Sequence, residues 1–284
     1  MLFSTRRVLP VAATGLALLV GACGDGGGKA VSSNCRPKYT VKTQQQGVLR
    51  VGAIQYPPYS TIKGGRAGGI DGQIMAGFAK AACLKLEAQE TTFAAAVSSV
   101  TTRRNDVAMG DLYRTKERAQ AVGLSNPVYL DQLGIVSKTG LGSMSALEGK
   151  KISTVQGYYF VAAVKKTFGK SVKLFPDNVK MYQDLFAGRS EAALDSLPAA
   201  VEYLKSLGKD GDYQVKVPPV DPRIPATGAQ AAQSAYAYAS SAHELGDGLN
   251  AYLEDIRSSG ALAKILAANG IPASAAQAGK PRLS

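Results

Sequence analysis

The chain has 284 residues, of which 45% are hydrophobic and 19% are charged. This composition supports a buried core in one or two domains and excludes an intrinsically disordered chain. The formal charge of +12 would suit a nucleic-acid-binding protein, but basic and acidic residues are interspersed, without a run of five basic residues. We therefore expect no nucleic-acid partner. The single histidine, His243, is expected at the surface or at a helix start, so we expect no metal and no cofactor.

The amino terminus has the organisation of a secretory signal. Arg6 and Arg7 precede an apolar stretch over residues 8–22, which is shorter than the roughly 20 residues of a membrane-spanning helix and typical of a signal-peptide core. The stretch ends in small and aliphatic residues followed by Cys23, an arrangement that resembles the lipobox of bacterial lipoproteins. This resemblance implies a signal peptide over residues 1–22 and a lipid on Cys23. Ordinary signal cleavage beside an incidental cysteine is the alternative.

Residues 23–45 are expected to form a lipidated tether and arm, because a glycine-rich segment follows Cys23. The remaining cysteines, Cys35 and Cys83, would enter an oxidising compartment, so we predict that they form a disulfide. One buried and one exposed thiol is the alternative. No later apolar run is long enough to cross a membrane, and we expect the rest of the chain to lie outside the cytoplasm.

From residue 47 onward, strand-like and helix-like segments alternate. Apolar residues at Ile74 and Phe78 illustrate the helical spacing, and the paired Pro57 and Pro58 end the first strand. The expected strands are residues 47–53, 85–88, 106–110, 133–137, 151–155, 172–175, 192–194 and 235–239. The expected helices are residues 71–84, 93–102, 159–168, 179–187 and 198–207, with two C-terminal helices that divide near 258–260. This alternation predicts an α/β protein with parallel, doubly wound sheets.

Short motifs along the chain resemble, in the same order, those of the family 3 extracellular solute-binding proteins that serve polar amino acid ABC importers. The motifs are residues 47–52 (GVLRVG), 58–59 (PY), 69–72 (GIDG), 115–118 (TKER), 124–129 (LSNPVY), 147–151 (LEGKK), 156–157 (QG), 188–195 (GRSEAALD) and 259–265 (SGALAKI). Each motif alone is weakly specific, whereas the ordered set is specific for the fold.

The resemblance implies a two-lobed, type II periplasmic-binding-protein-like fold, in which two doubly wound sheets are joined by a two-strand hinge. Lobe 1 would comprise residues 46–136 and 236–284, and lobe 2 residues 137–235. The lobes would close on an amino acid or a related amine-bearing small solute and present the closed form to an ABC importer permease. The protein would be a monomeric, membrane-anchored lipoprotein in the periplasm or at the outer face of the cell membrane.

The resemblance also implies which residues bind the carboxylate of such a solute. Arg118 ends the TKER motif beyond a lobe 1 strand, and its planar guanidinium can donate two parallel hydrogen bonds to a carboxylate. Gly157, Tyr158 and Tyr159 lie where a lobe 2 strand gives way to a helix, and free backbone N–H groups there would favour the same anion. A surface position on a helix is the alternative for Arg118.

Two further residues are candidates for the amino group of the solute. Asp195 follows a lobe 2 strand and would accept hydrogen bonds from the ammonium; a helix N-cap is its alternative role. Tyr56 would stack on the solute, and a cation over a tyrosine ring gains roughly 0.5–2 kcal/mol. Tyr59 is expected in the core.

Several positions depart from the family pattern. Relatives that bind basic side chains often have an acid where this chain has Ala53-Ile54, and many have a small hydroxyl residue at the position of Tyr158. Small residues are common where Asp111 and Tyr113 stand. If Asp111 faces the cleft, the excess negative charge and the aromatic wall would suit a cationic or amine-bearing solute.

Two other functions remain open at this point. An enzyme that resembles cyclohexadienyl dehydratases could use the same scaffold, but it needs a tuned acid or base, and Glu117 and Asp111 are the nearby acids. A sensor module would need a separate membrane partner. We expect a binding protein and not an enzyme.

Overall fold

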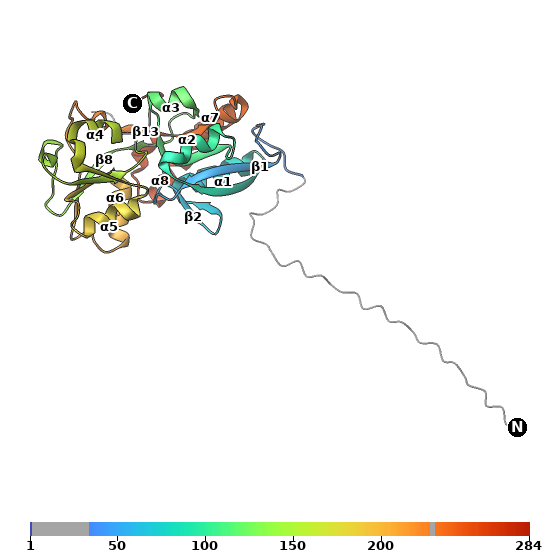
Figure 1. Cartoon of the computed structure of the whole chain (residues 1–284). Coiled ribbons are helices and arrows are strands. Elements are labelled where there is room, and N and C mark those ends of the chain that lie inside the picture. Colours follow the sequence, from blue (N-terminus) through green and yellow to red (C-terminus); the bar gives the residue numbers. More distant parts are fainter. Residues whose placement is uncertain (2–33, 228–230) are drawn as a thin grey trace.

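The computed structural model describes residues 1, 34–227 and 231–284, which form two α/β lobes side by side (Figure 1). Cys23 and, apart from Met1, the predicted signal peptide lie outside the described residues. Within the described segments, no helix has the length and apolar character needed to cross a membrane.

Lobe 1 is built on a six-stranded sheet with the order β4-β1-β5-β13-β6, and β7 pairs with β13. Its strands are β1 (Val48–Ile54), β4 (Lys85–Thr91), β5 (Val107–Tyr113), β6 (Gly123–Leu124), β7 (Leu130–Asp131) and β13 (Ala232–Tyr238). β1 is parallel to β4 and β5, whereas β13 is antiparallel to β5. The parallel part confirms the predicted alternation of strands and helices.

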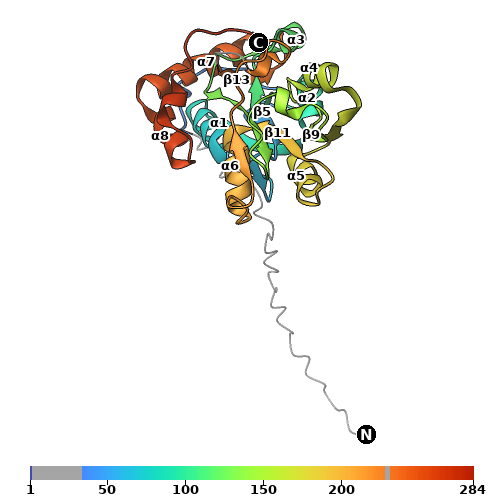
Figure 2. The same ribbon diagram turned by 90° about the vertical axis from the view of Figure 1, so that its left-hand side faces the viewer.

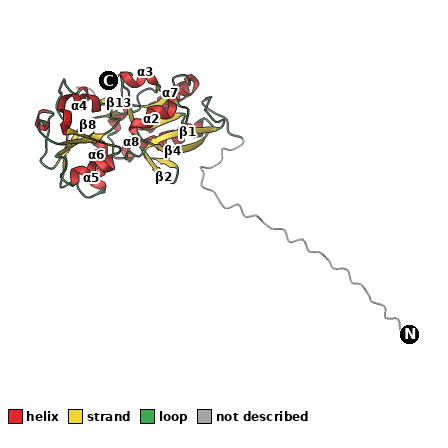
Figure 3. Ribbon diagram, in the orientation of Figure 1, coloured by secondary structure: helices red, strands yellow, loops and turns green. Residues whose placement is uncertain are grey.

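The helices of lobe 1 connect and cover this sheet. Because β4 and β5 flank β1 on opposite sides, right-handed connections place α1 and α2 on opposite faces of the sheet. A small hairpin precedes α1, and two helices near the C-terminus complete the lobe (Figure 3). These elements are β2 (Thr61–Lys63), β3 (Arg66–Gly68), α1 (Gly69–Ala81), α2 (Phe93–Thr101), α3 (Lys116–Ala121), α7 (His243–Ser258), α8 (Ala261–Ala268) and the 3-10 helix η4 (Ala273–Ala276).

Lobe 2 has a five-stranded sheet with the order β10-β9-β11-β8-β12. Its strands are β8 (Leu133–Ser137), β9 (Ile152–Val155), β10 (Val172–Phe175), β11 (Ala192–Ser196) and β12 (Gln214–Lys216). Helices α4, α5 and α6 surround the sheet in the end-on view of Figure 2. The helices are α4 (Val161–Phe168), α5 (Asn178–Phe186), α6 (Leu197–Ser206) and the 3-10 helices η1 (Ser145–Leu147), η2 (Gly169–Ser171) and η3 (Pro225–Thr227).

The chain passes between the sheets twice, from β7 to β8 and from β12 to β13. β8 pairs with β11 and β12 of lobe 2, and β13 pairs with β5 of lobe 1. Both strands occur where the sequence predicts strands, but the expected lobe boundaries at 136/137 and 235/236 cut through them. Sheet membership depends on hydrogen bonds between distant segments, which strand periodicity does not reveal.

The N-terminal arm is attached to lobe 1. Cys35 and Cys83 form a disulfide with their Cα atoms 5.8 Å apart, which confirms the predicted pair. The ring of Tyr39 packs on Phe78 and Tyr252, so the arm also covers part of the core between α1 and α7. His243 is exposed at the first residue of α7.

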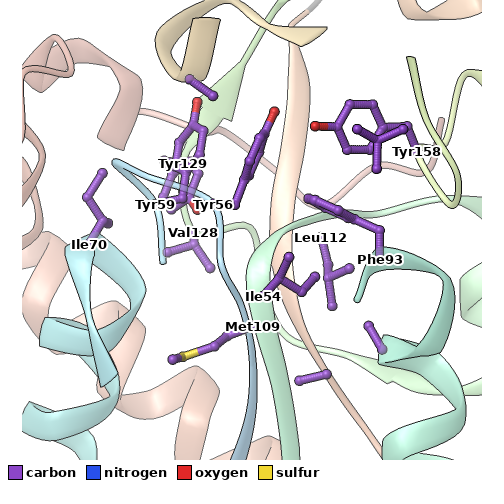
Figure 4. Packing of buried hydrophobic residues seen from close by; sticks show 14 of the residues in the cluster. Ile54, Tyr56, Tyr59, Ile70, Phe93, Met109, Leu112, Val128, Tyr129 and Tyr158 are labelled. Atoms are coloured by element: carbon purple, nitrogen blue, oxygen red, sulfur yellow. The ribbon is translucent and has the colours of Figure 1, made fainter. Parts of the chain in front are cut away.

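A cluster of buried hydrophobic residues runs through both lobes. Between the lobes it consists of aromatic rings: Tyr158 of lobe 2 packs on Tyr56 and Phe93 of lobe 1, with ring centroids 5.9 and 4.7 Å apart (Figure 4). Tyr59 is fully buried, as expected of a core residue. The lobes therefore meet through side chains.

Candidate functional site

The candidate site lies where the carboxyl ends of parallel strands from both lobes face one another, which is where doubly wound sheets bind ligands. Hydrogen bonds cross between the lobes, including one from Ser196 N to Tyr56 Oη at 3.2 Å. Tyr56 Oη donates to Asp195 Oδ1 at 2.5 Å, and Arg118 Nη2 donates to the Gly157 carbonyl oxygen at 3.2 Å. The hydroxyls of Tyr59 and Ser196 are 3.1 Å apart. The two lobes are thus closed on one another.

Arg118 is held at the bottom of the cleft by local structure. Thr115 caps α3 by accepting a hydrogen bond from Arg118 N at 3.1 Å, and the guanidinium donates to the Tyr113 carbonyl oxygen at 2.9 Å. None of the ion pairs among the described residues includes Arg118. Burial lowers the pKa of Arg118, and the nearby Asp111 charge opposes that effect. The side chain is a half-buried cation with N–H groups available to an anion.

Asp111 lies in the last part of β5, which continues beyond the predicted end at residue 110. The side chain is 5% exposed, and its Oδ1 has no hydrogen-bond partner among the described residues. Burial raises the pKa of Asp111 well above its ordinary value, and the charges of Asp131 and Asp71 raise it further. Asp111 therefore lines the cleft, as assumed from the sequence, with one carboxyl oxygen that lacks a hydrogen-bond donor within the described segments.

Asp195 occupies a different environment. Its carboxylate accepts hydrogen bonds from the hydroxyls of Tyr56, Tyr158 and Tyr182 at 2.5, 2.8 and 2.9 Å, and from Ser196 N at 2.9 Å. Burial raises the pKa of Asp195 to about 6, although these donors favour the charged form. The alternative role of Asp195 as N-cap is wrong, because Ser196 caps α6.

The closed cleft encloses a small cavity. Its lining consists of Tyr56, Phe93, Asp111, Tyr113, Arg118, Tyr158, Tyr159, Phe160 and Ser196. The cavity has a volume of about 20 Å³. A buried water needs a cavity volume of roughly 10–15 Å³, so the closed cavity admits one or two waters. Outside it, a groove of about 680 Å³ includes Arg118, Gly157 and the start of α4 in its lining. An amino acid can therefore enter only after the lobes separate.

The fold brings five of the predicted site residues together on the cavity wall: Tyr56, Asp111, Tyr113, Arg118 and Tyr158. Gly157 contributes its carbonyl oxygen to Arg118, and the Tyr158 N–H donates to the Val155 carbonyl oxygen at 3.3 Å. Helix α4 begins at Val161, later than the residue 159 expected from the sequence.

Asp195 does not line the cavity, whereas its neighbour Ser196 does, because successive side chains of a strand point to opposite sides. Sequence reasoning also missed Phe93 and Phe160. Phe93 follows β4, so the rule that ligands bind at strand ends could have found it.

The aromatic residues form the walls of the cavity. Phe93 lies between Tyr56 and Tyr158, with ring centroids 5.0 and 4.7 Å away, and the hydroxyls of the two tyrosines point toward one another in Figure 4. Tyr113 packs edge-on against Tyr159 at 4.6 Å, and its hydroxyl donates to Asp131. Within the described residues, no three acidic, histidine or cysteine side chains are grouped as a metal site.

The sequence matches the bacterial extracellular solute-binding proteins, family 3, over residues 49–269. The chain belongs to this family. The match covers both lobes and both crossings between them, so the family resemblance inferred from the ordered motifs is confirmed.

Individual relatives agree with this assignment. The chain is 26% identical over 172 residues to the L-cystine-binding protein of Escherichia coli (strain K12), a match that covers 58% of this chain and 64% of that protein. It is 29% identical over 126 residues to the lysine/arginine/ornithine-binding periplasmic protein of the same organism, covering 42% and 48%. An ancestral arginine-binding protein bound to arginine has a TM-score of 0.69 and 25% identity, and the match covers 79% of this chain and 98% of that structure. The predicted type II two-lobed fold is confirmed.

Proposed function

We propose that this protein captures an amino acid or a related amine-bearing small solute in the cleft between its lobes and delivers it to an ABC importer. Arg118 carries the proposal, because it is a half-buried guanidinium that lines the cavity and forms no ion pair with an acidic side chain among the described residues. A solute carboxylate would supply the missing charge and accept two parallel hydrogen bonds from the guanidinium. The names of the relatives, which bind cystine and basic amino acids, support this class of solute.

Capture would proceed by hinge closure. The segments between β7 and β8 and between β12 and β13 connect the lobes, with lobe 1 as residues 46–131 and 232–284 and lobe 2 as residues 133–227. The solute would bind to Arg118 in the open form and would be enclosed when Tyr158 and Tyr159 arrive with lobe 2. The permease would then select the closed form.

A binding assay with the purified mature chain tests this function. We expect isothermal titration calorimetry with the common L-amino acids, cystine and ornithine to find at least one ligand, whose decarboxylated analogue binds far more weakly. Arg118→Gln should weaken that binding by about 100-fold or more, since two charge-assisted hydrogen bonds are lost. Arg104→Gln is the matched control, because Arg104 is exposed. Unchanged binding by the Arg118 variant would contradict the proposal, and turnover of prephenate or arogenate would favour the dehydratase alternative.

We also propose that residues 1–22 are a signal peptide and that Cys23 carries a lipid, so that a monomer is anchored outside the cytoplasm near its permease. The small residues before Cys23 and the disulfide between Cys35 and Cys83, which requires an oxidising compartment, support this location. Mass spectrometry of the N-terminal peptide from membranes should find an acylated Cys23. A mature N-terminus at any other residue would contradict the anchor.

A further inference from the structure

We propose that Asp111 of lobe 1 binds the amino group of the solute. Asp195 of lobe 2 instead holds the lobes closed by accepting a hydrogen bond from Tyr56 of lobe 1. This inference rests on the proposed function, because it assumes that the solute is an amino acid or a close relative. It assigns both charged contacts of the solute, through Arg118 and Asp111, to lobe 1. Lobe 2 then contributes the aromatic side chains that enclose the solute when the lobes close.

One carboxyl oxygen of Asp111 lacks a hydrogen-bond partner in the described part of the chain. The Oδ1 atom is buried without a hydrogen-bond partner among the described residues, and Asp111 lines the same cavity as Arg118. A buried carboxylate oxygen without a donor costs free energy, so such groups are nearly always paired in folded proteins. A primary ammonium brings three donors and a positive charge. Its arrival would satisfy Asp111 while the solute carboxylate satisfies Arg118.

The backbone at Asp111 has an unusual conformation. Its φ is +56°, in the left-handed region that non-glycine residues seldom adopt, and the pairing of β5 with β13 shifts register at this point. Asp71 accepts a hydrogen bond from Asp111 N at 3.2 Å and is held by the hydroxyls of Tyr129 and Tyr236, each at 3.1 Å. Asp71 is therefore a positioning residue, which fixes the bulge that aims Asp111.

Asp195, in contrast, is fully buried and does not line the cavity. Its Oδ1 accepts hydrogen bonds from Tyr56, Tyr158 and Ser196 N. Its Oδ2 accepts the hydroxyl of Tyr182, so both oxygens are already bonded within the protein, unlike Oδ1 of Asp111. Tyr56 comes from lobe 1, whereas Tyr158 and Tyr182 come from lobe 2. The bond from Tyr56 to Asp195 exists only when the lobes are closed, so it stabilises the closed form.

The charges around Asp111 indicate the class of solute. The charge of Asp131, whose carboxylate accepts the Tyr113 hydroxyl, acts on Asp111 from within lobe 1. A solute with a second carboxylate would meet this negative field, whereas an additional amino group would be attracted to it. The site therefore favours neutral or basic amino acids with a free amino group over acidic ones.

The test compares each amino acid with its desamino analogue, which keeps the carboxylate and lacks only the amino group. The probes are the common L-amino acids, cystine and ornithine, and the calorimetric titrations are made with wild type, Asp111→Asn and Asp195→Asn. Asparagine keeps the shape of aspartate and tolerates left-handed backbone, so Asp111→Asn should fold. Circular dichroism and thermal unfolding of both variants check that they are folded.

We expect Asp111→Asn to weaken binding of the amino acid by about 10- to 100-fold and to leave binding of the desamino analogue unchanged. Asp195→Asn should weaken both ligands by the same factor, because it acts on closure and not on the amino group. Loss of amino-group discrimination in Asp195→Asn, or its retention in Asp111→Asn, would overturn the assignment while the proposed function stands. Absence of binding to every probe in wild type would overturn the proposed function itself, and this inference with it.

Discussion

At the scale of single residues, hydrogen-bond partners decide what each buried carboxyl in the cleft can do. Arg118 and Asp111 line one cavity and form no ion pair with each other, so both can respond to a zwitterion. Asp195 is equally buried but is surrounded by donors, and burial still raises its pKa to about 6. The same residue type thus has two roles, because its hydrogen-bond partners differ.

The raised pKa of Asp195 predicts a pH dependence of stability. Its pKa is about 6 in the folded chain and 3.8 as the ordinary reference, so the folded state binds a proton more tightly than the unfolded state. The associated stabilisation is fully present below pH 4 and is lost as the pH rises through about 6. Between pH 5 and 7.5 the free energy of unfolding should fall by roughly 1–2 kcal/mol from this carboxyl alone.

Chemical denaturation of wild type and Asp195→Asn at pH 5 and 7.5 measures this contribution. The variant should lose less stability than wild type over the interval, because its side chain does not titrate. The exposed Asp210→Asn is the control and should retain the wild-type slope. Identical slopes in wild type and Asp195→Asn would refute the prediction.

At the scale of elements, the site depends on the turn between β9 and α4. Gly157 in this turn has a φ of +91°, and a Cβ atom there would lie 2.6 Å from Ala94 N and 2.7 Å from Phe93 C, at the start of α2 in lobe 1. Only a residue without a Cβ allows the two backbones to approach so closely. The glycine therefore belongs to the closing contact as well as to the turn.

Gly157→Ala should prevent full closure and weaken solute binding by at least about tenfold, since closure supplies part of the affinity. Small-angle scattering with saturating ligand should find a larger radius of gyration for this variant than for wild type. Gly149→Ala is a matched control, because Gly149 also has a positive φ, +73°, but nothing lies within 4 Å of its added Cβ. A fully closed, tight-binding Gly157 variant would contradict the steric argument.

At the scale of the whole molecule, the two sheets and their crossings place most of the candidate binding residues at one cleft. The alternation of the longer strands and helices, the family and the disulfide between Cys35 and Cys83 could all be predicted from the chain. Periodicity and short motifs are local properties of the sequence, so they can be recognised without knowing which distant residues are in contact. The position of Arg118 on the cavity wall could be expected in the same way, because its motif follows a predicted strand.

Other features depended on the folded chain. The sheet that β8 and β13 join, the bulge that turns Asp111 into the cavity, and the choice of Ser196 over Asp195 as the lining residue follow from strand register and orientation. Tyr56 and Asp195 are 139 positions apart in the sequence and bond across the cleft. Such pairings depend on contacts between distant segments, whereas a motif includes only residues that are adjacent in the sequence. The proposed amino-group contact of Asp111 could therefore be inferred only from the tertiary structure.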